Sequence, residues 1–198
     1  METITLSKKL SSEVINIASD AINHGKIVLC PFDTVYGLVC DPKNELVIKG
    51  LIELKGRDQT KVIGMAASSV KMISFVAALN HDQIKYIEKI TPGAYTFLVK
   101  ARNDLDISIL CQKDGTIGIR IPDSQMIIDL IAAFGRPIAQ TSANKSGHPN
   151  CYNVQEFFNQ FDNAPDIDLV IDGGTLEERA PSQLIDLTKE KPKIIERG

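Results

Sequence analysis

Three positively charged side chains lie within seven positions of one another in the stretch ELKGRDQTKV: Lys55, Arg57 and Lys61. A helix that ends at Gly56 would leave Arg57 and Lys61 in the following loop. A rigid guanidinium fork and a compact ammonium group suit a phosphate or a carboxylate, so the stretch is a candidate anion clamp. Cations at a helix C-terminus also stabilise the helix dipole without binding anything, and the spacing alone leaves both interpretations open.

Two further stretches place polar residues beside predicted strands. In PFDTVYGL, Asp33 and Thr34 fall between two strands, where they either bond their own backbone or line a site. In TIGIRIPD, Arg120 alternates with Ile119 and Ile121, so its side chain leaves the strand on the face opposite to theirs. That face is either exposed to solvent or part of a cleft, in which Arg120 would bind an anion.

A fourth polar stretch, QTSANKSG, follows a short apolar strand and brings Ser142 and Asn144 into a turn. Their neutral donors and acceptors either satisfy that turn or bind a ligand. The chain contains no G-x-x-x-x-G-K-[ST], G-x-S-x-G or H-E-x-x-H pattern, which argues against a P-loop protein, an α/β-hydrolase and a zinc protease. With three histidines and four cysteines far apart, no His/Cys metal site is expected.

Helix and strand patterns alternate along the whole chain and must position these residues. Asn80 and Gln83 form a capping-box pattern, and Asp41 is the expected cap of another helix, with Pro42 at its first position. Helices are predicted over 11–25, 41–56, 68–79, 81–90, 123–135 and 154–161, and strands over 26–30, 36–40, 62–67, 95–101, 116–121, 137–140, 168–174, 182–188 and 193–197. This order predicts an α/β fold, a single domain over 1–198 with a mixed parallel and antiparallel sheet flanked by helices.

The composition is that of an ordinary globular chain. Its 198 residues are 43% hydrophobic and 24% charged, which suits one domain with a sizeable core. The net charge of −3 gives no support to non-specific nucleic-acid binding. The longest apolar runs are too short to span a membrane, and the first residues lack a secretory leader pattern. We therefore expect no membrane association, a cytoplasmic location and reduced cysteines.

Six segments, in order, resemble the YrdC-like family of L-threonylcarbamoyladenylate synthases: PFDTVYGL, KGRDQTK, TIGIRIPD, TSANKSG, PSQLIDLT and the terminal IIERG. The resemblance runs from Lys26 to the last residue and covers the short, one-domain form of the family. It implies a twisted sheet with a concave, positively lined cleft. It also implies a nucleotidyltransferase that makes threonylcarbamoyl-AMP and pyrophosphate from L-threonine, bicarbonate and ATP with Mg²⁺.

The resemblance further implies partners and residue roles. The product would serve threonylcarbamoyladenosine modification of tRNA through partner transferase proteins, with tRNA or double-stranded RNA as possible direct contacts. The implied ATP-binding residues are Lys55, Arg57, Lys61, Thr116, Ser142, Asn144 and Arg197, of which Lys55, Arg57, Ser142 and Asn144 are the implied catalytic set. The implied threonine-binding residues are Thr34, Arg120 and Ser182. Phe32, Val62 and Gln183 depart from the residues usual in the family.

Three alternatives remain open at this stage. A YciO-like paralogue shares the fold, but that group tends to lose the asparagine that Asn144 represents here. A non-catalytic RNA-binding module would use the same concave face and show steep salt dependence. A carbamoyl-transferring relative from hydrogenase maturation would usually carry additional domains.

Overall fold

A computed structural model describes residues 2–6, 11–58, 61–161 and 167–195, in which ten strands form one sheet. The strands are β1 (Glu2–Thr5), β2 (Val28–Pro31), β3 (Tyr36–Cys40), β4 (Gly64–Ala66), β5 (Tyr95–Lys100), β6 (Thr116–Arg120), β7 (Ile138–Ser142), β8 (Leu169–Asp172), β9 (Gln183–Asp186) and β10 (Lys193–Ile195). Their order across the sheet is β1-β8-β2-β3-β7-β4-β6-β5-β9-β10. The pairs β1–β8, β2–β8, β4–β6 and β5–β9 are parallel and the other five are antiparallel, which confirms the predicted mixed sheet.

Six helices and one 3₁₀ turn flank the sheet in the described part of the chain. They are α1 (Ser11–Asn23), α2 (Glu45–Leu54), α3 (Val70–Ile73), α4 (His81–Ile90), α5 (Gln125–Phe134), α6 (Val154–Gln160) and the 3₁₀ turn η1 (Ile109–Cys111). The capping box of Asn80 and Gln83 at the start of α4 is confirmed. The predicted cap of α2 is wrong, because Asn44 accepts the Val47 N–H at 3.2 Å and the helix starts after it. Asp41 instead accepts a hydrogen bond from the Arg136 guanidinium at 2.7 Å.

Two other elements differ from their predictions. The expected helix over 68–79 is helical only at Val70–Ile73, and Ala77 then forms a bridge with Ala101. Strand β1 was not predicted, because its sequence ETIT is short, polar and mostly exposed. It forms by adding to the edge of β8 through backbone hydrogen bonds, which a side-chain pattern does not encode.

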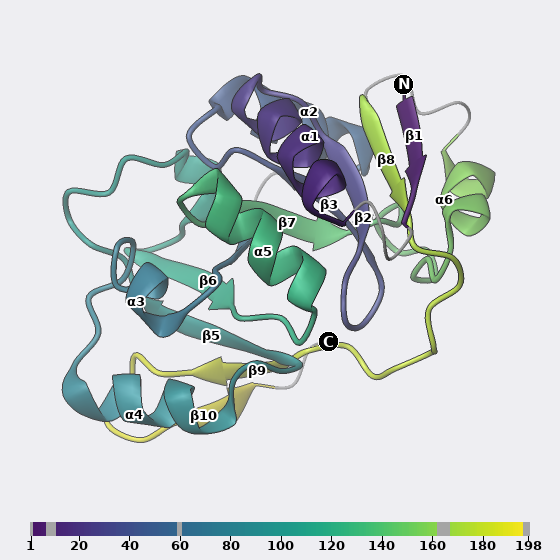
Figure 1. The fold of residues 1–198 in the computed structure, drawn as a ribbon. Coiled ribbons are helices and arrows are strands. Elements are labelled where there is room, and N and C mark those ends of the chain that lie inside the picture. The colour runs from purple at the N-terminus through teal and green to yellow at the C-terminus, as the bar shows by residue number, and fades with distance from the viewer. Residues whose placement is uncertain (1, 7–10, 59–60, 162–166, 196–198) are drawn as a thin grey trace.

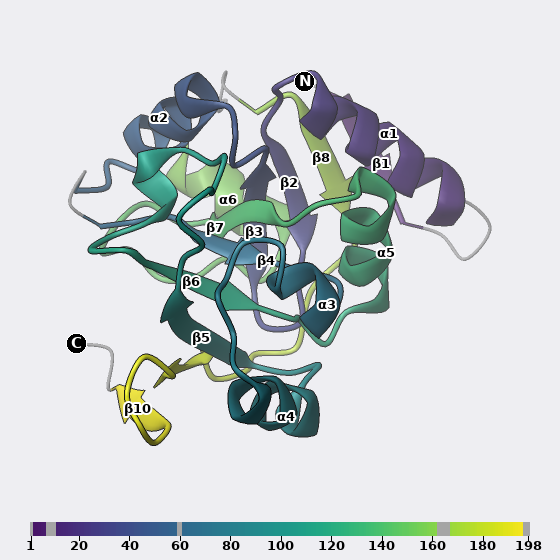
Figure 2. The same cartoon turned by 90° about the vertical axis from the view of Figure 1, so that its left-hand side faces the viewer.

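Helices cover the sheet in two layers, and one stretch of its surface remains open. Helices α1 and α5 lie side by side in both views and share one apolar cluster with α3 and α4, whereas α2 and α6 contribute to a second cluster (Figures 1 and 2). In β6, Ile117 and Ile119 are fully buried in the first cluster, while the intervening Gly118 and the following Arg120 line an open cleft. This alternation positions the candidate site.

The connection from β8 to β9 carries a further segment to that cleft. Residues 173–182 form no helix or strand and cross from one half of the sheet to the other (Figure 1). The connection is anchored where the buried Tyr36 hydroxyl donates to Gly174 O at 2.8 Å and accepts the Gly173 N–H at 2.9 Å. None of the helices in the described part of the chain is long and apolar enough to cross a lipid bilayer.

Candidate functional site

One cleft of about 350 Å³ collects residues from five of the motif-bearing segments. Of the ten residues predicted to form a site, five line it: Thr34, Arg57, Arg120, Ser142 and Ser182. They come from the β2–β3 loop, the loop after α2, β6, β7 and the connection to β9. Segments far apart in sequence therefore converge, and none of the described residues lining the cleft is an Asp or a Glu.

The end of α2 determines where two of the cations lie. Gly56 takes a left-handed backbone with φ of 55°, and the N–H groups of Gly56 and Arg57 bond to Glu53 O and Ile52 O at 2.9 and 3.0 Å. This pair of bonds is the Schellman motif, which ends a helix sharply at a glycine. The predicted helix stop at Gly56 is thus confirmed, and it separates Lys55, held by the helix, from Arg57, released into the loop.

Lys55 lies beneath the cleft and does not line it. Its side chain is buried, and its ammonium group donates to Ser142 O, to Asn144 O at 2.5 Å and to Asn144 Oδ1 at 3.5 Å. The Lys55 carbonyl in turn accepts the Ser146 N–H at 2.9 Å. Burial, and secondarily the positive charge of Arg57, lower the pKa of Lys55 to about 7. Lys55 therefore fixes the turn that follows β7.

Ser142 and Asn144 are held together in that turn. The Ser142 hydroxyl donates to Asn144 Oδ1 at 2.6 Å. The Asn144 amide nitrogen donates to His148 O at 2.7 Å and to Lys145 O at 3.0 Å, and the residue is 9% exposed. Asn144 thus orients Ser142, which lines the cleft.

Arg57 is fixed at the cleft by the loop that follows it. Its Nε donates to Lys61 O at 3.2 Å and its Nη2 donates to Val62 O at 2.9 Å, while Nη1 lies 3.5 Å from Thr141 Oγ1. These bonds to carbonyls restrain the guanidinium at the cleft. Lys61 is exposed and lies outside the cleft lining.

Arg120 makes a buried ion pair with Asp33. Its Nη2 donates to the two carboxylate oxygens at 2.8 and 2.6 Å, and the side chains are only 4% and 3% exposed. Asp33 also accepts the Asp123 N–H at 3.1 Å, and Arg120 donates to Gly93 O at 3.3 Å. The pair joins the β2–β3 loop to the end of β6 and places the buried Thr34 beside Arg120 in the cleft lining.

A pair of hydroxyl groups from β5 and the connection to β9 also lines the cleft. The Ser182 and Thr96 hydroxyls lie 2.9 Å apart, and the Gln183 N–H donates to Ala94 O at 2.9 Å. Thr96 was missed by the motif analysis, although its alternation with the apolar Phe97 in the strand pattern YTFLV would assign its side chain to the face opposite to that of Phe97.

One predicted ATP contact lies away from the cleft, and another cannot be placed. Thr116 is at the opposite end of β6 from Arg120, donates to Lys113 O at 2.7 Å and does not line the cleft. Arg197 lies outside the described residues. Other cleft-lining residues were not singled out from sequence, among them Gly64, Gly118 and Gln140. The sequence signal that could have identified Gly64 and Gly118 is a glycine inside a predicted strand, which often marks the close approach of a ligand or of another backbone.

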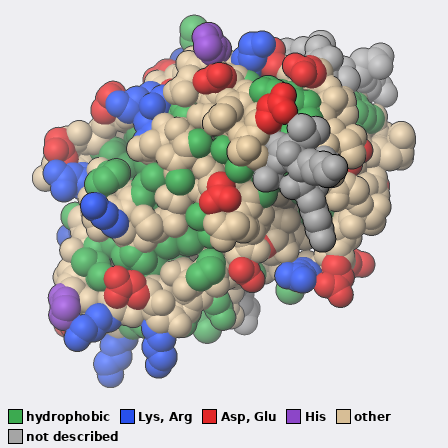
Figure 3. All heavy atoms as spheres, viewed as in Figure 1, with side chains coloured by type: hydrophobic (Ala, Val, Ile, Leu, Met, Phe, Trp, Pro, Cys, Tyr) green, Lys and Arg blue, Asp and Glu red, His purple; other side chains and the backbone are tan. Residues whose placement is uncertain are grey.

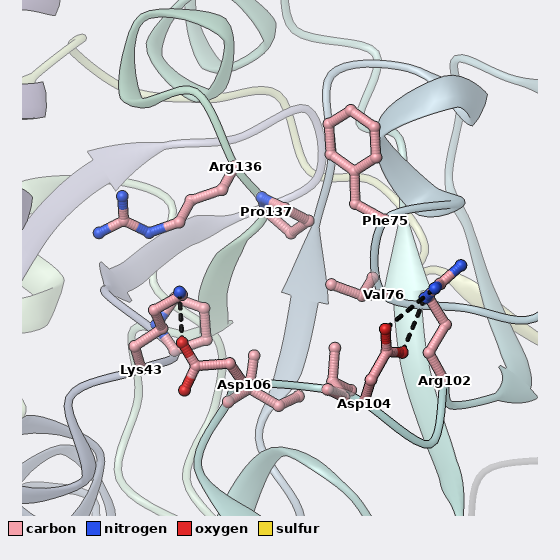
Figure 4. Close-up of a pocket in the computed structure, with 11 residues that line it drawn as sticks. Lys43, Phe75, Val76, Arg102, Asp104, Asp106, Arg136 and Pro137 are labelled. Carbon is pink, nitrogen blue, oxygen red and sulfur yellow. Dashed lines mark hydrogen bonds and ion pairs between the residues drawn. The ribbon is translucent and has the colours of Figure 1, made fainter.

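A second pocket, of about 260 Å³, contains none of the predicted residues. Figure 4 shows two ion pairs in its lining, Lys43 with Asp106 at 2.5 Å and Arg102 with Asp104 at 3.0 Å, while Arg136 of the lining pairs with Asp41 outside it. The four cysteines are buried, and no group of three or more His, Cys, Asp or Glu among the described residues is arranged to hold a metal ion. The first cleft is therefore the candidate site.

Comparison with known proteins decides the family. The sequence model of the Sua5/YciO/YrdC family, described as "Telomere recombination", matches residues 20–198. The chain belongs to this family. The resemblance inferred from the six segments is thereby confirmed, as is the fold class.

Relatives in this family are similar over most of the chain. A Vibrio cholerae protein named threonylcarbamoyl-AMP synthase is 33% identical over 177 residues, covering 88% of this chain and 93% of that protein. The structure of Pyrococcus abyssi Sua5 complexed with L-threonine superposes with a TM-score of 0.88 at 26% identity, covering 98% of this chain but only 56% of that one. Escherichia coli YciO superposes with a TM-score of 0.84 at 23% identity, which shows the shared fold.

Proposed function

We propose that the chain is an L-threonylcarbamoyladenylate synthase, a nucleotidyltransferase that makes threonylcarbamoyl-AMP and pyrophosphate from ATP, L-threonine and bicarbonate or carbon dioxide. The observation that carries the proposal is the convergence of Arg57 and Ser142 with Thr34, Arg120 and Ser182 in one cleft. The relatives named threonylcarbamoyl-AMP synthase support it, as does the threonine complex of Pyrococcus abyssi Sua5.

Threonine would bind at the Arg120 side of the cleft. Its carboxylate would approach the guanidinium of Arg120, which Asp33 already holds in place. The hydroxyls of Thr34, Thr96 and Ser182 would receive the amine and the side-chain hydroxyl. Because the Arg120 charge is largely balanced by Asp33, this part of the cleft suits a zwitterion better than a polyanion.

ATP would bind at the Arg57 side. The Arg57 guanidinium lines the cleft and is restrained by Lys61 O and Val62 O, and its planar fork of donors suits phosphate oxygens. The Ser142 hydroxyl would orient the nucleotide, and Lys61 would add a cation at the rim. We assign Lys55 and Asn144 an indirect part, in which they hold the Ser142 turn in position.

The reaction would need alignment more than a protein nucleophile. The threonine nitrogen bonds to the carbon of carbon dioxide and loses a proton, which gives a carbamate. A carbamate oxygen then bonds to the α-phosphorus of ATP while the bond to the bridging oxygen breaks, and pyrophosphate leaves. Arg57 would stabilise the charge that develops on the phosphates.

Mg²⁺ would enter with ATP. Carboxylates are the usual protein ligands of this ion, and none of the described residues lining the cleft carries one. Phosphate oxygens and water would therefore hold the ion, which would neutralise part of the phosphate charge.

We further propose that the product passes to a transferase that modifies tRNA and that the reaction takes place in the cytoplasm. Direct binding of RNA has less support. Figure 3 shows Lys and Arg interspersed with Asp and Glu on the face it displays, and the net charge is −3. Non-specific binding to phosphate backbones depends on gathered positive charge.

Pyrophosphate release with ATP, bicarbonate and each amino acid in turn tests the proposal. We expect release to require L-threonine, and we expect Arg57→Ala to lower it by at least about 100-fold, since a charge that stabilises a transition state is lost. Arg102→Ala is the matched control, because Arg102 is exposed, pairs with Asp104 and lies outside the cleft. Release without threonine, or wild-type turnover in Arg57→Ala, would contradict the proposal.

A further inference from the structure

The second pocket, of about 260 Å³, lies apart from the candidate site, and the described residues that line the two do not overlap. Much of its lining is apolar: Pro42, Val76, Leu105, Ile107 and Pro137. An apolar cavity of about 150 Å³ is large enough to hold a benzene ring. The pocket therefore has room for an aromatic side chain.

Ion pairs balance the charged groups around this pocket. They are Lys43 with Asp106, Arg102 with Asp104, and Arg136 with Asp41. Because each of these cations already has a carboxylate partner, a polyanion gains no net attraction here, and a basic segment gains none either. The surroundings of the pocket suit an occupant whose own contact surface carries no net charge.

Phe75 stands at the rim of the pocket and is 55% exposed. Figure 4 shows its ring at the edge of the pocket, above Val76. The backbone on both sides of this position is held in place, since the Phe75 N–H donates to Met72 O at 3.1 Å and Val76 O accepts the Arg102 N–H at 3.0 Å. The place from which the ring projects is thus fixed, which lowers the entropy cost of burying the ring in a complex.

A contact with two-fold symmetry uses the same patch of both chains, so that patch must be complementary to itself. Here a protruding aromatic ring and an apolar recess lie next to each other on one surface. The balanced charges also allow two copies of this surface to face each other without net repulsion. We propose that the chain forms a two-fold symmetric dimer in which Phe75 of each copy enters the pocket of the other.

The dimer leaves the candidate site untouched. None of the described residues lining the cleft lines the second pocket. The proposed reaction therefore does not depend on the dimer, and pyrophosphate release per chain should be the same in Phe75→Ser as in the wild type. The dimer and the proposed function can thus fail separately.

Sedimentation equilibrium over a series of protein concentrations tests the dimer. We expect the wild type to associate reversibly and Phe75→Ser to raise the dissociation constant at least about tenfold, because an aromatic side chain that fills a pocket at an interface carries much of the binding energy. Phe75→Leu, which keeps an apolar side chain, should raise it less. Leu46→Ser is the matched control: Leu46 is 79% exposed but does not line the pocket, and we expect the wild-type dissociation constant.

A second variant changes the charge of the rim instead of its shape. Asp104→Lys combined with Asp106→Lys should keep the fold, because these side chains are 70% and 82% exposed. The rim then carries positive charge where it was balanced, so two copies repel each other. We expect a dissociation constant at least about tenfold higher at low salt, with a partial return toward the wild-type value as salt screens the repulsion.

A wild type that sediments as a monomer throughout the series would overturn the dimer. A Phe75→Ser variant that dimerises as tightly as the wild type would overturn it too, because association would then use another surface. The same holds if the doubly substituted rim leaves the dissociation constant unchanged at low salt.

Discussion

The buried pair of Arg120 and Asp33 makes a large and measurable difference to stability. The substitution Asp33→Asn keeps the shape of the side chain but removes the charge that balances a guanidinium whose side chain is only 4% exposed. Removing one partner of a buried ion pair costs about 3–5 kcal/mol, because the other charge remains buried without compensation. We therefore expect the free energy of unfolding to fall by that amount.

Urea unfolding of matched variants provides the assay. Arg102 and Asp104 form the control pair, since the same residue types bond at 3.0 Å but with side chains 47% and 70% exposed. Asp104→Asn should leave the free energy of unfolding close to the wild-type value, because exposed ion pairs contribute little. If Asp33→Asn proved as mild as Asp104→Asn, the argument that Arg120 depends on Asp33 would be wrong.

Two further predictions concern the end of α2. The folded-state pKa of Lys55, about 7, lies below its ordinary value of 10.5, so the unfolded chain binds more protons between these values and stability rises with pH across that window. Relative to Lys55→Met, the wild-type free energy of unfolding should gain up to about 1.4 kcal/mol per pH unit between pH 7 and 10, and parallel pH curves would refute this. Gly56→Ala should lower the free energy of unfolding by about 1 kcal/mol, because the φ of 55° at this position disfavours a residue with a Cβ. Urea unfolding would measure this loss, and an unchanged unfolding midpoint would contradict the assignment of a Schellman motif.

Local signals in the sequence predicted the elements whose boundaries depend on local chemistry. Asn80 with Gln83 started α4, and Gly56 ended α2, because a cap or a left-handed glycine acts within a few residues. The prediction that Asp41 caps α2 was wrong because a distant arginine, Arg136, donates a hydrogen bond to its carboxylate. Strand β1 was missed because partner-strand pairing, rather than its own pattern, makes it a strand.

For the candidate site, too, local motifs could be predicted from the sequence and long-range contacts could not. The motifs identified Arg57, Ser142, Thr34, Arg120 and Ser182, and the structure brings these five into one cleft. The sequence could not show that Lys55 faces the carbonyls of Ser142 and Asn144, since that depends on how the end of α2 meets the turn after β7. It also could not assign Asp33 to Arg120, because the two residues are 87 positions apart.

Mass spectrometry of the product formed from ¹³C-labelled bicarbonate tests the central claim most directly. With ATP and L-threonine, the wild-type protein should form a threonine adduct of AMP that is heavier by the one labelled carbon, in an amount equal to the pyrophosphate released. An unlabelled adduct, or consumption of ATP with no adduct of threonine, would contradict the account.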